Sequence, residues 1–316
     1  MAISLGVLMD PIESINTKKD STFAMLLESQ KRGWDIWYMQ QSDLFLAENR
    51  VSARMQKLSV EDNPNHWFTL SETRTEPLDT LDVILMRKDP PFDMEYIYTT
   101  YLLESAEKLG CLVVNSPASL RDCNEKLFTS WFPQCCPETV VSRNHEQVLN
   151  FVNKHQEAII KPLGGMGGTS IFRAHSGDPN LNVIIETLTD NGRQFTMAQR
   201  FIPEIRDGDK RILLVDGEAV PYALARIPKP GENRGNLAVG GKGVGVPLSE
   251  RDYWIASQVA PVLKQKSILF AGLDVIGDFL TEINVTSPTC IRELDAQFNL
   301  NISAQLLDSI EEKLHS

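Results

Sequence analysis

The segment AIIKPLGGMGGTS (residues 158–170) runs from an apolar strand into a turn that holds four glycines. Glycine has no Cβ atom, so the backbone of such a turn can approach a phosphate with its N–H groups exposed. Lys161 precedes the glycines, whereas the lysine of a G-x-x-x-x-G-K-[ST] loop follows them, and the chain contains no such loop. The segment therefore indicates either a phosphate site of another kind or a plain glycine-rich hairpin turn.

The N-terminal side of this segment alternates between strand and helix patterns. Strand–helix–strand alternation predicts a parallel, doubly wound sheet, so the fold class expected here is α/β. Polar residues 47–80 interrupt the alternation and predict an excursion with one short strand around ARMQKLSV (53–60). The regular elements expected in this region are strands at 3–9, 35–39, 83–87 and 111–115 and helices at 22–32 and 94–109.

The regular alternation of predicted strands and helices ends after about Ser119. Residues 120–132 (LRDCNEKLFTSWF) predict one helix that ends at Pro133, and a strand and a second helix from Asn144 follow. Beyond the glycine turn, the Asp-Gly pair in RILLVDGEAV (211–220) predicts an antiparallel hairpin, which makes this part α+β. The remaining elements expected are a strand in FTMAQRFI (195–202), a strand in PYALARI (221–227), a helix at 249–266, a strand pair at 269–276 and 279–285, and a terminal helix.

The composition is that of an ordinary globular protein with an acidic balance. Of 316 residues 42% are apolar, which allows two or three domains. Lys and Arg total 31 against 42 Asp and Glu, and the net charge of −11 would repel a nucleic acid or an anionic membrane. The chain has no signal peptide pattern and no membrane span, and its five cysteines show no C-x-x-C spacing. We therefore expect a cytoplasmic protein with free thiols and without nucleic-acid or membrane partners.

Glu282 and Asn284 lie two residues apart in the strand-like segment FLTEINV, so both side chains point to one face. A carboxylate beside an amide oxygen is a pair suited to Mg²⁺, and Asp274 on the preceding strand is the natural third ligand. A two-residue turn between the strands would put Asp274 and Glu282 on opposite faces, so a shared site requires an odd-residue loop or a β-bulge. Solvent-facing polar residues on a half-exposed strand are the alternative.

Seven ordered motifs resemble those of one protein family. With Lys126, Lys161 and the Glu282–Asn284 pair, they resemble the ATP-grasp superfamily and, more narrowly, prokaryotic glutathione synthetases over nearly the whole chain. The resemblance implies an ATP-grasp fold preceded by a doubly wound parallel-sheet domain. The motifs are LMDPI (8–12), RKDPPFD (87–93), LRDCNEKLF (120–128), DGDKR (207–211), ARIP (225–228), RGNLAVGGKG (234–243) and TEINVTSPTCIRE (281–293). The expected domains are 1–122 for substrate binding, 123–202 for the central ATP-grasp part with the glycine-rich loop, and 203–316 for the C-terminal ATP-grasp part.

The resemblance also implies an activity. In this family ATP phosphorylates a carboxylate of γ-L-glutamyl-L-cysteine, and the amine of glycine attacks the acyl phosphate to give glutathione, ADP and phosphate. ATP, Mg²⁺ with Mn²⁺ as a substitute, small-molecule substrates and a homotetramer are implied with it. One alternative is another ATP-grasp carboxylate–amine ligase, of the D-alanine–D-alanine or glutamate type, which would not be expected to share RKDPPFD or SPTCIRE. A second is a non-catalytic ATP-binding regulator, and a dinucleotide-binding oxidoreductase is disfavoured because no G-x-G-x-x-G follows the first strand.

The same resemblance implies four groups of site residues. The expected ATP-binding residues are Lys126 in the predicted helix, Lys161, Gly164, Gly165, Met166, Gly167, Gly168, Gln199, Arg200, Phe201, Ile202 and Asp209. The expected metal ligands are Asp274, Glu282 and Asn284. The expected catalytic residues, which would face the acyl phosphate, are Arg211, Arg226 and Asn236. The expected dipeptide-binding residues are Arg87, Lys88, Asp89, Ser287, Pro288, Thr289 and Arg292.

Residues 229–246 contain six glycines and few bulky apolar side chains, so this stretch cannot bury enough surface to order itself. An acyl phosphate hydrolyses if water reaches it, and a ligase that uses one needs a cover. We therefore expect the stretch to close over bound substrates, with Arg234, Asn236 or Lys242 in contact with them. Lys242 stands where this family often has arginine, so the charge is kept and bidentate carboxylate recognition is lost.

Limited proteolysis tests this expectation. Without ligands the chain should be cut within residues 229–246, and ATP with the dipeptide should protect it. Shortening the stretch should raise ATP hydrolysis relative to peptide-bond formation, because water then reaches the intermediate. Equal cleavage with and without ligands, together with unchanged coupling in the shortened enzyme, would show that the stretch is an ordinary connection.

Overall fold

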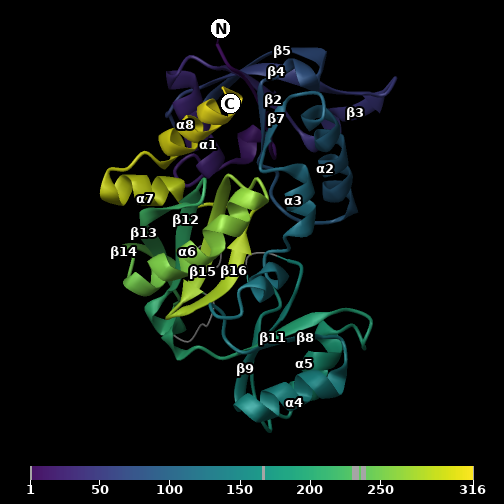
Figure 1. Cartoon of the computed structure of the whole chain (residues 1–316), viewed down its shortest axis with the longest axis vertical. Helices are drawn as coiled ribbons and strands as arrows, with labels where there is room; N and C mark the ends of the chain where they lie inside the picture. Colours follow the sequence, from purple (N-terminus) through teal and green to yellow (C-terminus); the bar gives the residue numbers. More distant parts are fainter. Residues whose placement is uncertain (1, 166–167, 230–234, 236–239, 316) are drawn as a thin grey trace.

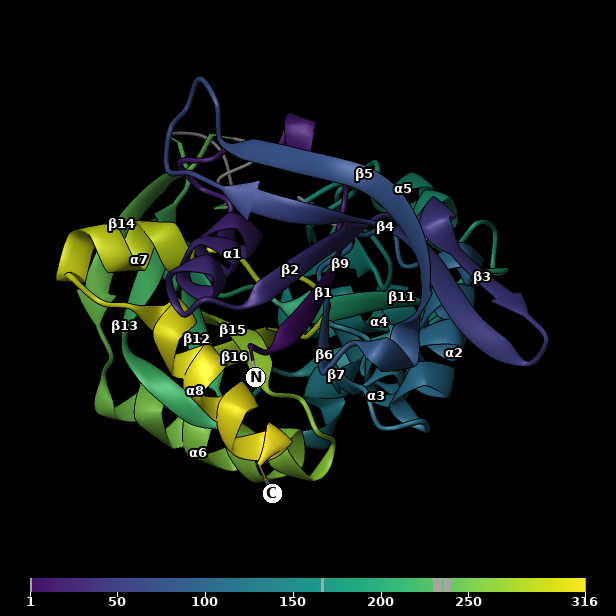
Figure 2. The same cartoon turned by 90° about the horizontal axis from the view of Figure 1, so that it is seen from above.

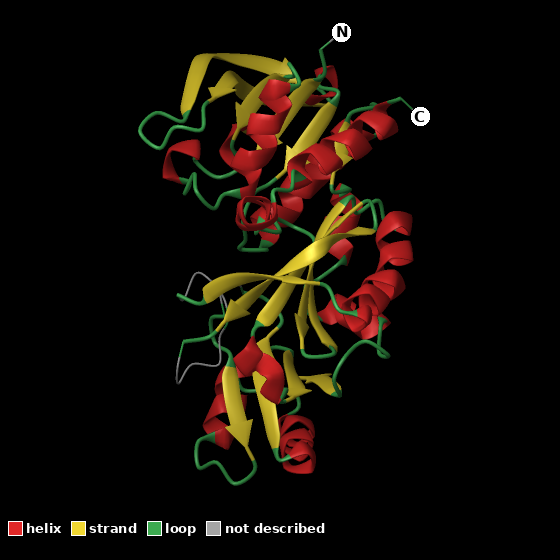
Figure 3. Cartoon of the chain, turned by 90° about the vertical axis from the view of Figure 1, so that its left-hand side faces the viewer, coloured by secondary structure: helices red, strands yellow, loops and turns green. Residues whose placement is uncertain are grey.

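Three β-sheets lie along the long axis of the molecule, and the last sheet in the sequence lies between the other two (Figure 1; Figure 3). The structure, a computed structural model, describes residues 2–165, 168–229, 235 and 240–315. No helix in these ranges is both long enough and apolar enough to span a bilayer. The α/β fold class, with an α+β C-terminal part, is confirmed.

The first sheet has the order β3-β4-β2-β1-β6-β7, with β5 paired to β4. Its parallel core of β2, β1, β6 and β7 confirms the doubly wound prediction. Figure 2 shows α1 on one face of this core and α2 with α3 on the other. The strands are β1 (Ser4–Leu8), β2 (Asp35–Met39), β3 (Leu44–Ala47), β4 (Arg50–Val60), β5 (Phe68–Pro77), β6 (Val83–Met86) and β7 (Leu112–Val114). The helices are α1 (Ser21–Lys31), α2 (Met94–Glu107), α3 (Pro117–Asp122) and the short 3-10 turns η1 (Ile12–Ser14), η2 (Gln41–Asp43) and η3 (Leu78–Thr80).

The excursion at residues 47–80 is larger than the single short strand predicted. It contains the long antiparallel hairpin of β4 and β5. In β4 the buried side chains alternate with exposed ones, at Val51, Ala53 and Met55, until a bulge shifts the register. β5 buries almost nothing, so its sequence carries no hydrophobic period from which a strand could be predicted.

The second sheet has the antiparallel order β10-β9-β11-β8, and helices α4 and α5 pack on it around a small separate core. Helix α5 and strand β10 were not predicted. The strands are β8 (Thr139–Ser142), β9 (Glu157–Pro162), β10 (Phe172–His175) and β11 (Thr196–Arg200), and the helices are α4 (His145–His155) and α5 (Leu181–Leu188). A 3-10 turn, η5 (Pro203–Asp207), leads from this sheet into the third.

The third sheet has the antiparallel order β14-β13-β12-β15-β16. Its β12–β13 hairpin turns at Asp216 and Gly217, which both have positive φ, and this confirms the predicted Asp-Gly turn. The segment PYALARI belongs to β13 of the same hairpin. The strands are β12 (Asp209–Val215), β13 (Glu218–Ile227), β14 (Lys242–Pro247), β15 (Phe270–Ile276) and β16 (Phe279–Asn284), and the helices are α6 (Glu250–Gln265), α7 (Ile291–Phe298) and α8 (Ile302–Leu314).

The C-terminal helix α8 returns to the first sheet and packs beside α1 (Figure 1). Arg32, at the end of α1, forms ion pairs with Asp308 and Glu311 of α8, at 2.7 and 3.1 Å. The two ends of the chain are therefore joined at this face, and the expected domain limits at 122 and 202 remain predictions.

The single helix predicted for residues 120–132 is wrong. Helix α3 ends at Asp122, and a separate 3-10 helix, η4 (Leu127–Trp131), follows. The Asn124 side chain accepts hydrogen bonds from the N–H groups of Lys126 (3.1 Å) and Leu127 (2.8 Å), which competes with helical bonding. The Glu125 carbonyl accepts from Ile283 N–H of β16 (2.8 Å). Lys126 therefore lies in a linker bonded to β16 and not in a helix.

The glycine-rich stretch 229–246 also differs from the prediction in part. Residues from Lys242 onward form β14, which pairs with β13 as Lys242 with Ile227 and Gly243 with Arg226. Residues 230–234 and 236–239 lie outside the described residues, so the expectation of a cover rests on the sequence alone.

Candidate active site

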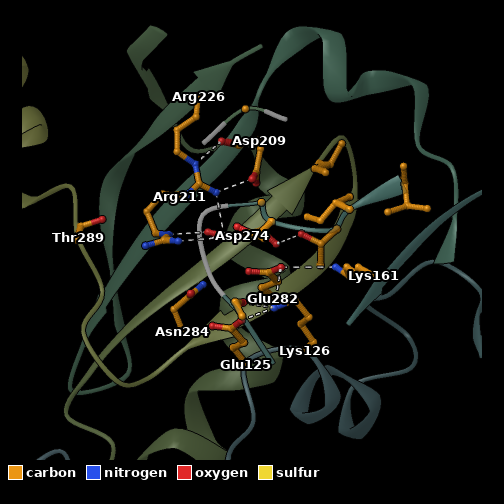
Figure 4. A pocket seen from close by; sticks show the side chains of 18 of the residues that line it. Glu125, Lys126, Lys161, Asp209, Arg211, Arg226, Asp274, Glu282, Asn284 and Thr289 are labelled. Carbon is orange, nitrogen blue, oxygen red and sulfur yellow. Dashed lines mark hydrogen bonds and ion pairs between the residues drawn. The ribbon is translucent and has the colours of Figure 1, made fainter. Parts of the chain in front are cut away.

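One cavity of about 510 Å³ opens among the second sheet, the third sheet and the loops of the first (Figure 4). Its size is that of a small-molecule site. Most of the residues predicted from the sequence line it. These are Asp89, Lys126, Lys161, Gly165, Gly168, Gln199, Arg200, Phe201, Ile202, Asp209, Arg211, Arg226, Asp274, Glu282, Asn284, Ser287 and Thr289.

A β-bulge brings the acidic side chains to one face of the third sheet. The β15–β16 hairpin turns in two residues, since Ile276 pairs with Phe279, but Asp274 pairs with Glu282 and not with Thr281. Residues directly opposite each other in an antiparallel pair share a face. The bulge that the sequence required for a shared site is therefore present, and the hydroxyl of Thr281 donates to the Asp274 carbonyl (3.0 Å).

Two arginines hold Asp274 in a buried ion network. Arg211 binds both of its carboxylate oxygens, with Nε–Oδ1 at 2.5 Å and Nη2–Oδ2 at 3.0 Å. Arg226 reaches the same carboxylate at 2.9 Å and Asp209 at 2.5 Å. Burial acts to raise the pKa of Asp274, but the two guanidinium groups outweigh it and hold that pKa below its ordinary value. Asp274 is therefore ionised.

Asp209 belongs to the same ion network, but its pKa shifts in the opposite direction from that of Asp274. Burial raises its pKa to about 7, although Arg226 opposes the rise. Its Oδ1 atom is buried and has no hydrogen-bond partner within the described ranges. This cavity-lining residue thus has a buried carboxyl oxygen that no group in the described chain satisfies.

Two lysines from separate elements converge on Glu282 (Figure 4). Lys161, at the end of β9, lies 3.6 Å from its carboxylate, and Lys126, in the linker, lies 3.8 Å from it. Lys126 also pairs with Glu125 and donates to the Gly165 carbonyl (3.1 Å). Burial alone would lower the pKa of Lys126, but Glu282 and Glu125 raise it, so the ammonium group stays charged.

Asn284 lies on the same face of β16 as Glu282. Its amide nitrogen donates to the Gly272 carbonyl (3.3 Å), so the amide oxygen is the atom directed away from that bond. The expected metal set is two carboxylates and one amide, Asp274, Glu282 and Asn284. Over the described ranges, no three His, Cys, Asp or Glu side chains gather as a metal site by themselves.

The glycine turn contributes Gly165 and Gly168, whose φ angles of 97° and 78° favour glycine. Gly164 is not among the described lining residues, and Met166 and Gly167 lie outside the described part of the chain. Asn236, an expected catalytic residue, lies outside it as well.

The expected ATP-binding residues from Gln199 to Ile202 all line the cavity. Two of their N–H groups already have acceptors within the chain, since Arg200 donates to the Glu138 carbonyl and Phe201 to that of Glu157. The N–H groups of Arg200 and Phe201 are therefore not free to bind a base.

The protein residues that were expected to bind the dipeptide fall into two groups. Asp89, Ser287 and Thr289 line the cavity, whereas Arg87, Lys88, Pro288 and Arg292 are not among its described lining residues and have partners of their own. Arg87 is buried and donates to the Thr22 hydroxyl (3.0 Å) and the Pro288 carbonyl (2.9 Å). Lys88 pairs with Asp10 and Arg292 with Asp62, both at 2.8 Å.

The cavity also has lining residues that sequence reasoning missed. Glu125 stands directly before Lys126, and burial raises the pKa of its carboxyl. Asp20 and Glu293 are acids whose pKa burial also raises. Adjacency to Lys126 could have indicated Glu125, but Asp20 and Glu293 lie far apart in the sequence and carry no local signal. The missed lining residues with polar side chains are Asn16, Lys19, Asp20, Glu125, Thr169, Thr281 and Glu293.

Solved structures share this fold. The crystal structure of D-cycloserine synthetase DcsG has a TM-score of 0.69 at 12% identity, covering 98% of this chain and 100% of that chain. The ATP-grasp ligase PsnB complexed with minimal precursor has a TM-score of 0.64 at 15% identity, covering 99% of each chain. At such low identity these likenesses bear on the fold alone.

Sequence comparison is more specific. Residues 3–121 match the N-terminal domain of prokaryotic glutathione synthetase, and residues 125–299 match its ATP-grasp domain. A glutathione synthetase of Pseudomonas putida KT2440 is 61% identical over 314 residues, which are 99% of each chain. One from Escherichia coli O127:H6 is 59% identical over 312 residues, again 99% of each. With its sheets, its cavity and its full-length similarity in agreement, this chain belongs to the prokaryotic glutathione synthetase family.

Proposed function

We propose that this protein joins γ-L-glutamyl-L-cysteine to glycine at the expense of ATP, giving glutathione, ADP and phosphate. The observation that carries the proposal is the convergence of Lys126 and Lys161 on the face that also holds Glu282, with Arg211 and Arg226 beside it. These four cations line one cavity together with carboxylates that a divalent cation could bind, so the lining suits phosphate groups that arrive with a metal ion. The relatives named above carry the same activity in their names.

The reaction needs two displacements. A carboxylate oxygen of the dipeptide attacks the γ-phosphorus of ATP, and ADP leaves. The amine of glycine then attacks the carbonyl carbon of the acyl phosphate, phosphate leaves, and the amine loses its proton. Lys126 and Lys161 would hold the ATP phosphates, and Arg211 and Arg226 would face the acyl phosphate and stabilise its charge. Such a site works through positioning and electrostatics and needs no covalent enzyme intermediate.

The donor set on β15 and β16 fits Mg²⁺, with Mn²⁺ as a substitute. Hard oxygen ligands on one face, Glu282 and the amide oxygen of Asn284, suit a small divalent cation that shares its shell with phosphates. Asp274 would join them by exchanging one of its guanidinium partners. When bound, the ion would neutralise charge on the transferring phosphoryl group.

The dipeptide would occupy the end of the cavity next to the first sheet. Asp89, Ser287 and Thr289 are the expected dipeptide-binding residues that line the cavity. Arg87 would act as a positioning residue, because its hydrogen bonds to Thr22 and the Pro288 carbonyl tie the loop 286–289 to α1. We also propose a cytoplasmic location, in keeping with five cysteines that are all free thiols. A homotetramer is proposed from the family resemblance.

The substrates that phosphate release requires test the proposed reaction. Phosphate release should require ATP, Mg²⁺, γ-glutamylcysteine and glycine together, because the second displacement is needed to discharge the intermediate. Phosphate assays with each component omitted in turn, and mass spectrometry of the product, measure this. Equal turnover with pairs of D-alanine, or no turnover with the named pair, would contradict the proposal.

Substitution of Glu282 tests the proposed cation site. Glu282→Gln should lower kcat/KM by about a hundredfold or more, since a neutral amide replaces the carboxylate expected to bind the cation. The melting temperature should stay within about 3 °C of wild type, because the side chain keeps its size and Lys126 keeps Glu125 as a partner. Glu146→Gln on α4, an exposed site away from the cavity, is the matched control. Full activity of Glu282→Gln at limiting Mg²⁺ would place the cation elsewhere.

A further inference from the structure

Strand β5 is an open edge of the first sheet. It pairs with β4 on one side, and within the described chain no strand pairs with its other side. Figure 2 shows β5 running along the outer border of the sheet. An edge strand presents a row of unpaired N–H and C=O groups that another strand can bind. Its residues do not line the cavity, so a partner here would leave the cavity open.

The exposed side chains of β5 carry alternating charge. Glu72, Arg74 and Glu76 lie two residues apart and therefore share one face of the strand. All three are exposed, and within the described ranges none forms an ion pair. The Arg74 guanidinium lies 5.9 Å from the centre of the Trp37 ring, which sets the side of the sheet on which it stands.

We propose that β5 is a twofold interface, where it pairs antiparallel with β5 of a second copy of this chain. With the axis at Thr73, Glu72 lies directly opposite Arg74 of the partner subunit, and the same pair recurs by symmetry. This register overlaps the strands from Thr69 to Pro77.

Two neighbouring registers also place the charged faces of the two strands on the same side, but their charge pairing or strand overlap is less favourable. An axis at Arg74 places the two arginines opposite each other and Glu72 opposite a glutamate. An axis at Thr75 restores opposite charges, between Arg74 and a glutamate, but overlaps only Thr73 to Pro77. Opposite charges across a strand pair stabilise it and like charges destabilise it. Charge and overlap together therefore select the axis at Thr73.

A second copy of this chain is favoured over other partners because the charge pattern of β5 is self-complementary. When two copies pair antiparallel, glutamate of one strand meets arginine of the other. Association of two chains that each carry −11 is opposed by long-range repulsion, so a contact between copies needs locally opposite charges. β5 offers these with few apolar side chains, and salt should therefore weaken the contact. The inference does not depend on the proposed reaction.

Charge exchange tests the interface and its register. Glu72→Arg and Arg74→Glu should each raise the dissociation constant of the contact by about tenfold or more, because both symmetric pairs become like-charged. The double variant Glu72→Arg/Arg74→Glu should recover the wild-type value. An equimolar mixture of the two single variants should recover it as well, since each arginine then meets a glutamate. Sedimentation velocity over a dilution series gives the masses and dissociation constants.

Glu146→Arg on α4 is the control for a change of charge alone and should associate as wild type does. Circular dichroism checks the fold of each variant, and recovery in the mixture is an independent check. The proposal is overturned if the single variants keep the wild-type association, if neither the double variant nor the mixture recovers it, or if the wild-type chain is monomeric throughout. Unaffected single variants would mean that copies meet elsewhere, for example on the exposed apolar side chains Met94, Tyr98 and Tyr101 of α2.

Discussion

One extra residue in the β15–β16 hairpin determines which side chains share a face at the centre of this molecule. Without the bulge at Thr281, a two-residue turn would place Asp274 and Glu282 on opposite sides of the sheet. With it, Glu282 and Asn284 face the lysines of the second sheet and the linker, while Asp274 faces the arginines of β12 and β13. The donor set proposed for Mg²⁺ depends on this register.

Burying the charged groups on this face of the sheet costs desolvation free energy. Asp274, Arg211 and Arg226 are almost fully buried, and moving such groups out of water costs several kcal/mol each before pairing offsets it. Pairing of this kind is weak evidence for stability, so positioning is the better explanation for its presence. The network sets the guanidinium groups of two neighbouring strands side by side, aimed at one cavity. A site that relies on electrostatic preorganisation for phosphoryl and acyl transfer needs that arrangement before its substrates arrive.

Sequence reasoning predicted what local patterns encode. The parallel core of the first sheet, the Asp-Gly hairpin and the need for a bulge beside Asp274 all follow from periodicity and turn chemistry, and all are present. The split of the helix at Asn124 was missed, because it arises from a side-chain bond and from pairing of Glu125 with the distant β16. Strand β5 was missed because it buries no periodic face. Asp20 and Glu293 reach the cavity only through tertiary packing, which no short pattern records.

The central claim is that the dipeptide carboxylate is activated by phosphorylation within this cavity. Labelling both oxygens of the cysteinyl carboxylate of γ-glutamylcysteine with ¹⁸O tests it most directly. If the carboxylate attacks ATP and glycine then displaces phosphate, one ¹⁸O moves into inorganic phosphate for each glutathione formed, and the other stays in the new peptide bond. Mass spectrometry or ³¹P NMR of the released phosphate measures the transfer. One labelled oxygen per phosphate is the expected result, and glutathione formation with unlabelled phosphate would contradict the account.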